Sequence, residues 1–236
     1  MSLLYMIRHA QASFAEADYD RLSPLGHEQA GLLAAHLARS GVEFDAVYRG
    51  RQRRHEQTLE AYLADCARRG IKAPAPQESR FFDEYDAGAI LRTFLPVLIR
   101  EDPGFEAEVE KMKSSNRAFQ KVLEKVLLRW FDHRDETQQL ESWASFTARV
   151  QRGLFEVMAR EGAGRRVAVF TSGGPISAAV QKALTLSNES TLSIVRQIVN
   201  SSVTRFKYSG DRMTLFGFND FTHLEPGYSD RLITYR

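Results

Sequence analysis

Five apolar residues stand almost at the start of the sequence, Leu3 to Ile7, and Arg8 and His9 follow them at once. An uninterrupted apolar run of this length is typical of a strand that is buried on both faces of a sheet. In open α/β sheets, ligands bind outside the carboxyl ends of such strands. The run therefore predicts a central β-strand, and it places Arg8 and His9 at the edge where a site would form.

The remainder of the chain alternates between strand and helix patterns. Ser23 and Pro24 are typical of a helix start, and Gly41 of a helix stop. Further elements are predicted as strands at 44–48 and 165–170, a helix at 52–69, and a hairpin formed by SSVTRFKY and RMTLFGF. This alternation predicts an α/β fold, a doubly wound three-layer sandwich with a mostly parallel central sheet. We expect a single domain over residues 1–236 that carries a helical insertion at about 89–139.

Composition excludes several classes of protein. The 32 basic and 30 acidic residues leave a net charge of +2, which does not indicate a nucleic-acid partner. No apolar stretch is long enough for a membrane span and no basic region precedes Leu3, so we expect a cytoplasmic protein without a membrane partner. Cys66 is the sole cysteine, which excludes intrachain disulfides and thiol-rich metal sites. We predict neither a cofactor nor a metal ion, and the oligomeric state stays undetermined.

Polar residues follow several of the predicted strands. They are the pair Arg8-His9, the arginine-rich turn 49–54, the acidic segment DEYDAG after Phe82, and the turn Thr171-Ser172-Gly173-Gly174. Arginines and helix N-terminal amides bind phosphate oxygens, a neutral imidazole can attack phosphorus, and a protonated carboxyl group can donate to the leaving oxygen. Together these residue types predict phosphoryl transfer through a phosphohistidine.

The same segments resemble the histidine phosphatase superfamily, also called the phosphoglycerate mutase-like fold, over nearly the whole chain. RHAQAS is similar to the family's Arg-His-Gly opening, with Ala10 in place of glycine, and LSPLGHEQA is similar to the segment that follows it. RRHEQT resembles the family's Arg-Ala-x-x-Thr pattern, and FDEYDAG resembles the segment that carries the acid.

This resemblance implies roles for particular residues. It implies that His9 is the nucleophile and Glu84 the acid, and that Arg8 and Arg54 bind the phosphate. The other arginines of the 49–54 turn should matter much less to phosphate binding. It further implies that small phosphorylated substrates or phosphoproteins are the partners, and that Glu141 and His223 are structural.

The departure from the family pattern that matters most for activity lies at position 172. Where the family has a Ser-His-Gly-Gly turn, this chain has Thr-Ser-Gly-Gly, so Ser172 takes the place of the second family histidine. Serine can donate a hydrogen bond but cannot carry positive charge, so we expect a slower enzyme, with the Gly173 amide and Ser13 as further phosphate contacts. If the pocket has room, Ser172→His should raise turnover at least about tenfold.

The resemblance implies a phosphatase that hydrolyses a phosphomonoester or a phosphoprotein, and alternatives to this function remain open. The chain could be a catalytically weakened relative that binds a phosphorylated ligand or partner, or, less well supported around Glu84, a mutase. A serine hydrolase elbow would need glycine at position 170, which is Phe170, and a zinc motif would need histidine at Gly31 or Leu59. His27 and His55 are therefore interpreted as helix-surface or core residues. The insertion is expected to act either as a cap, in which Arg92, Arg100 or Phe94 meets the substrate, or as a plain helical layer.

Overall fold

The computed structural model describes residues 1–13, 19–112, 114–133, 140–225 and 230–235. Its strands are β1 (Ser2–Arg8), β2 (Ala46–Arg49), β3 (Gln77–Glu78), β4 (Arg166–Thr171), β5 (Val203–Ser209) and β6 (Arg212–Asp220). Its α-helices are α1 (Pro24–Arg39), α2 (Arg53–Arg68), α3 (Ala87–Glu101), α4 (Glu106–Met112), α5 (Asn116–Asp132), α6 (Trp143–Glu161), α7 (Gly173–Leu184) and α8 (Asn188–Val195).

The strands form one sheet in the order β3-β2-β4-β1-β5-β6. The first four are parallel, whereas β5 runs antiparallel to β1 and pairs with β6 as the predicted hairpin. Every residue of β1 is buried, because this strand lies between β4 and β5 and both its faces are covered. The predicted α/β sandwich with a mostly parallel sheet is confirmed.

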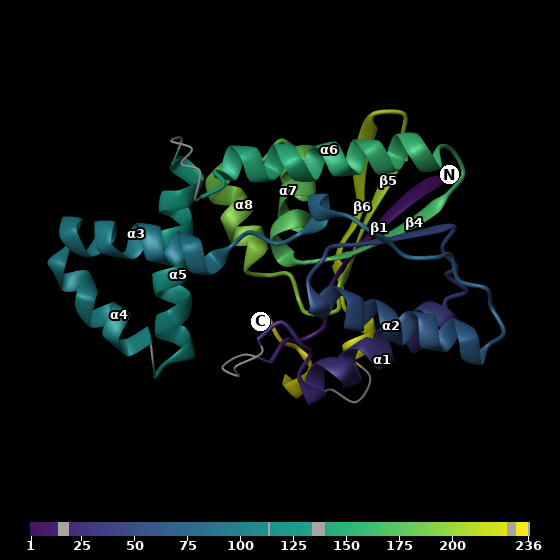
Figure 1. Cartoon of the computed structure of the whole chain (residues 1–236), viewed down its shortest axis with the longest axis horizontal. Helices are drawn as coiled ribbons and strands as arrows, with labels where there is room; N and C mark the ends of the chain where they lie inside the picture. Colours follow the sequence, from purple (N-terminus) through teal and green to yellow (C-terminus); the bar gives the residue numbers. More distant parts are fainter. Residues whose placement is uncertain (14–18, 113, 134–139, 226–229, 236) are drawn as a thin grey trace.

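Two layers of helix cover the sheet (Figure 1). Leu3, Tyr5 and Ile7 of β1 belong to one core cluster with residues of α1 and α2. Leu4 and Met6 belong to a second cluster with residues of α6 and α7. Because successive side chains of a strand point to opposite faces, the single apolar run supplies both cores. This arrangement makes the three layers that the sequence predicts.

Local signals in the sequence account for the helix ends. The Ser23 hydroxyl accepts a hydrogen bond from the Gly26 amide at 3.0 Å and so caps α1, with Pro24 as its first residue. Gly41 follows the helix with a φ of 61°, a conformation that glycine adopts without strain. The start and the stop of α1 therefore lie where the sequence predicts them.

The predicted insertion forms α3, α4 and α5, which lie to one side of the sheet in Figure 1. Aromatic side chains attach it to α6: Phe131 stacks on Trp143 with ring centroids 3.9 Å apart, and the Trp130 indole donates to the Glu141 carbonyl at 2.8 Å. The insertion is thus packed against the sandwich by a large aromatic cluster. The C-terminal end of the insertion, 134–139, lies outside the described residues, and the single-domain boundary stays a prediction.

None of the helices in the described part of the chain is long and apolar enough to cross a membrane.

Candidate active site

A cavity of about 180 Å³ opens at the carboxyl ends of β1 and β4. Five of the residues predicted from the sequence line it, together with residues of α5, α8 and the loops. The residues that line it include Arg8, His9, Tyr19, Arg54, Glu84, Tyr85, Phe119, Leu123, Glu124, Leu127, Gly173, Gly174, Val195, Arg196 and Tyr235. The parallel strands bring these distant segments together because their carboxyl ends meet at one edge of the sheet.

His9 lies just beyond the end of β1 and is 4% exposed. Its Nδ1 lies 2.7 Å from the carbonyl oxygen of Ala10, which can only accept, so Nδ1 carries the proton and Nε2 is left with its lone pair. The Ala10 amide in turn donates to the Thr58 hydroxyl at 3.0 Å, which fixes this loop. Burial, followed by the nearby charges of Arg54 and Arg8, holds the pKa of His9 well below 6.5. The imidazole is therefore neutral.

Arg8 is buried beside His9 and is held by backbone carbonyls. Its guanidinium donates to Ile198 and, at 2.9 Å, to Tyr235. Its Nε has no partner among the described residues, although it is buried. The guanidinium is therefore fixed in place and still has a donor to offer.

Arg54 enters the cavity from the first turn of α2. Its Nη1 lies 2.5 Å from the Asp20 carboxylate, and its Nε is buried without a partner in the described part of the chain. Asp20 also accepts from the Arg53 amide at 2.8 Å, so it caps the positive end of α2. An anion that binds the Arg54 guanidinium would share this guanidinium with the Asp20 carboxylate.

Glu84 faces these arginines across the cavity. The Gly174 amide at the start of α7 donates to Glu84 Oε2 at 3.1 Å, and the Tyr85 amide donates to Oε1 at 3.1 Å. A Cβ at Gly174 would lie only 2.0 Å from Glu84 Oε1, so a side chain at this position would displace the Glu84 carboxylate. Burial is the largest influence on the pKa of Glu84 and raises it. A raised pKa keeps more of the carboxyl group protonated, as a proton donor requires.

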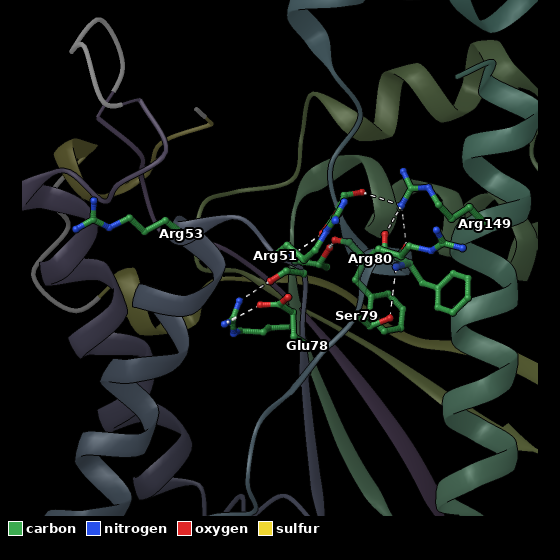
Figure 2. Close-up of polar contacts among 12 residues, drawn as sticks. Arg51, Arg53, Glu78, Ser79, Arg80 and Arg149 are labelled. Atoms are coloured by element: carbon green, nitrogen blue, oxygen red, sulfur yellow. Dashed lines mark hydrogen bonds and ion pairs between the residues drawn. The ribbon is translucent and has the colours of Figure 1, made fainter. Parts of the chain in front are cut away.

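The backbone before Glu84 is fastened by two arginines outside the cavity (Figure 2). Arg149 of α6 donates to the carbonyls of Arg80 and Phe81 at 2.7 and 3.2 Å, and Glu141 holds its other side at 2.8 Å. Arg51 binds the Asp83 carboxylate at 2.6 Å. Glu141 thus contacts this segment through Arg149, and Arg51 is paired away from the cavity.

Ser172 and Ser13 lie outside the cavity wall. Ser172 is fully buried, and its hydroxyl lies 2.6 Å from Nε2 of His55, which is also fully buried. Ser13 is 3% exposed, and its amide donates to the Arg21 carbonyl at 2.8 Å. Gly173 lines the cavity as predicted. The sequence interpretation of His55 as a surface or core residue gave no sign of its contact with Ser172, because 117 positions separate the two.

The insertion meets the cavity through α5. Phe119, Leu123 and Leu127 line it, while an ion pair between Glu124 and Arg196 lies beside them. Arg92, Arg100 and Phe94, which the sequence offers for a cap that meets the substrate, are not among the residues that line this cavity. Phe94 is 3% exposed within the core cluster, where its ring packs against His133. In the sequence, the apolar face of α5 cannot be distinguished from an ordinary core face.

The fold and the composition of this site define a class of protein. The chain belongs to the histidine phosphatase superfamily, branch 1, whose family model matches residues 4–90 and 87–221. The resemblance found in the sequence is thus confirmed at the level of the superfamily. No curated protein matches the chain.

Several solved structures have the same fold. Phosphoserine phosphatase of Entamoeba histolytica, a mutant in complex with phosphoserine, has a TM-score of 0.65 at 17% identity over 95% of this chain and 100% of its own. Phosphoglycerate mutase of Bacillus anthracis has a TM-score of 0.61 at 19% identity, covering 94% of both chains. A mycobacterial glucosyl-3-phosphoglycerate phosphatase with inorganic phosphate has 0.62 at 20%, over 94% and 99%. These similarities establish the fold, and the structures include both phosphatases and a mutase.

Proposed function

We propose that this protein hydrolyses a small phosphomonoester through a phosphohistidine intermediate on His9. The observation that carries the proposal is the hydrogen bond from His9 Nδ1 to the Ala10 carbonyl, which leaves Nε2 as a nucleophile in a cavity that Arg8, Arg54 and Glu84 also line. Superfamily membership and the phosphorylated ligands of the related structures support the same reading.

In the first step, the Nε2 lone pair attacks phosphorus and the bond from phosphorus to the ester oxygen breaks. The leaving oxygen takes the proton of Glu84, whose pKa is raised by burial. Arg8, Arg54 and the Gly173 amide at the start of α7 would face the charge on the phosphoryl oxygens. The products of this step are the free alcohol, a Glu84 carboxylate and phosphorylated His9.

In the second step, water attacks phosphorus and gives a proton to the Glu84 carboxylate. The bond between phosphorus and His9 Nε2 breaks, and its electron pair returns to the imidazole. The neutral histidine and the protonated carboxyl group are thereby restored, and inorganic phosphate leaves. The same carboxyl group serves as acid in one step and as base in the other.

The shape of the cavity favours a small substrate. A volume of about 180 Å³ suits a phosphate group with a modest organic part. That part would lie against Phe119, Leu123 and Leu127, which favours an apolar or aromatic group over a sugar. A phosphoprotein would have to present its side chain alone.

A second candidate function is the binding of a phosphorylated ligand without efficient turnover. The observation that favours it is Ser172, which stands where the family pattern has a histidine and which has no charge to offer the transition state. Both candidates use the same arginines, so binding of phosphate alone does not distinguish them.

Trapping of the intermediate tests the proposal. Rapid acid-free quenching with a ³²P-labelled aryl phosphate should give a phosphoenzyme that is labile in acid and absent in His9→Ala. His27→Ala is the matched control, because His27 is exposed on α1 and should leave labelling unchanged. Label on Ser172 alone would overturn the mechanism. Release of inorganic phosphate no faster than from His9→Ala would favour the binding protein, and transfer to a second alcohol in place of water would indicate a mutase.

A further inference from the structure

His55 and Ser172 are the two departures from the family pattern that involve a histidine. The resemblance implies that His55 stands where the Arg-Ala-x-x-Thr pattern has alanine, and that Ser172 stands where the glycine turn of the family has histidine. In the structure the two side chains contact each other, with His55 Nε2 2.6 Å from Ser172 Oγ. The turn between β4 and α7 has no histidine at position 172, and the side chain that contacts this position is a histidine of α2.

The surroundings of His55 are shaped to hold an imidazole. Its ring lies beside that of His9, with centroids 5.7 Å apart and planes inclined by 35°. A Cβ at Gly50 would lie 2.4 Å from His55 Nδ1 and 2.6 Å from the Phe82 carbonyl, so the absence of a side chain at Gly50 makes the space.

The Ser172 side chain contacts His55 and does not cap helix α7. Ser172 is the N-cap residue of α7, with the extended backbone that capping requires, yet its side chain makes no capping hydrogen bond. Its hydroxyl is turned to His55 instead. The residues that follow, Gly173 and Gly174, line the cavity, and the Gly174 amide holds Glu84. The His55–Ser172 hydrogen bond therefore ties α2, which carries Arg54, to the turn that orients the acid.

We propose that His55 is a positioning residue that replaces, from α2, the histidine that the family pattern has at position 172. It acts through Ser172 on the first turn of α7, and through its ring on the orientation of His9. This inference rests on the proposed function, since positioning has meaning only for a site that transfers phosphate. The earlier expectation for Ser172→His must change, because an imidazole at 172 would collide with the ring of His55.

Exchanging the two side chains tests the proposal most directly. Ser172→His alone should lower turnover of an aryl phosphate, whereas the double variant His55→Ala/Ser172→His should turn over at least about tenfold faster than His55→Ala alone. Rescue by moving the ring to another backbone position is not expected of a residue that only stabilises the core. A folded double variant with no gain over His55→Ala would overturn the proposal.

A second pair of variants covers the case in which the double variant does not fold. His55→Gln keeps a hydrogen-bond donor for Ser172, whereas His55→Leu fills similar space without one. We expect the kcat of His55→Leu to fall at least about tenfold and that of His55→Gln by no more than about threefold, with the Kd for inorganic phosphate within about threefold in both. Equal kcat values in the two variants would contradict a role for the hydrogen bond.

Controls separate this inference from the proposed function. His27 begins the same His-Glu-Gln triplet as His55 but is exposed on α1, so His27→Leu should leave kcat unchanged. If the unmodified protein turns over no faster than His9→Ala, the proposed function fails and the inference fails with it. If the unmodified protein is active and the His55 variants behave alike, the inference alone is wrong.

Discussion

His9 and Glu84 are pushed towards their neutral forms by the same cause. Burial penalises a charge of either sign, so it lowers the pKa of the imidazole and raises the pKa of the carboxyl group. Arg8 and Arg54 lower the pKa of both groups as well. At His9 this effect adds to that of burial, whereas at Glu84 it opposes burial. A neutral nucleophile and a protonated acid can therefore coexist in one cavity, which the proposed reaction requires.

This pairing predicts a bell-shaped dependence of kcat/KM on pH. Activity should fall at low pH when His9 becomes protonated, and this limb should lie well below pH 6.5 because the pKa of His9 is lowered. Activity should fall at higher pH when Glu84 loses its proton, above the ordinary value of 4.5 because its pKa is raised. The measurement is a profile with an aryl phosphate for the unmodified protein and for Glu84→Gln.

The Glu84→Gln variant distinguishes ionisation of the enzyme from ionisation of the substrate. Glu84→Gln should turn over more slowly and should lose the limb at higher pH, whereas ionisation of the substrate phosphate affects both proteins alike. An unchanged limb at higher pH in Glu84→Gln would mean that another group donates the proton.

Helix α5 is expected to contact the part of the substrate that is not phosphate. Its Phe119, Leu123 and Leu127 line the cavity, so the helix supplies apolar contact, whereas the proposed phosphate ligands Arg8 and Arg54 come from β1 and α2. Apolar contact of this kind is equal in the ground state and the transition state. It should therefore affect KM more than kcat.

Leu123→Ala tests this division of labour. We expect KM for an aryl phosphate to rise about fivefold or more with kcat little changed, because loss of apolar contact costs about 1 to 3 kcal/mol in a binding pocket. Inhibition by inorganic phosphate should be unchanged, since phosphate has no apolar part. Leu128→Ala is the control, because Leu128 lies on the same helix and is 37% exposed. Equal effects on the aryl phosphate and on inorganic phosphate would show that α5 supports the whole cavity instead.

Several histidines of the molecule are buried and have lowered pKa values. His9, His55 and His223 all have lowered pKa values, chiefly through burial, and that of His223 falls to about 4. In the unfolded chain each would titrate near 6.5. Below that pH the unfolded state binds protons that the folded state does not, so the free energy of unfolding decreases as the pH falls.

We therefore expect the protein to lose stability between about pH 6.5 and pH 4. Urea unfolding at several pH values measures the slope of stability against pH. His223→Gln keeps a polar partner for Ser201 and should reduce this slope by up to about 1.4 kcal/mol per pH unit, the contribution of one proton. His27→Gln, at an exposed position, should leave the slope unchanged. An equal slope in His223→Gln would mean that His223 is protonated in the folded protein as well.

The sequence by itself determined the order of the elements and the edge at which the site forms. The apolar run before Arg8, the cap at Ser23 and the glycines after β4 are local signals, and each acts on the backbone within a few residues. Because parallel strands end at one edge, these signals suffice to place His9 and Gly173 at one cavity.

Only the tertiary structure decided which distant side chains meet. His55 contacts Ser172, and Arg149 holds the segment before Glu84. Leu123 lines the cavity and Arg92 does not. All three results depend on how the helices are rotated and placed against the sheet. The periodic pattern of a helix shows which face is apolar but not which partner covers it. His55 and His27 each begin a His-Glu-Gln triplet, yet His55 is a buried neighbour of His9 whereas His27 is exposed to solvent.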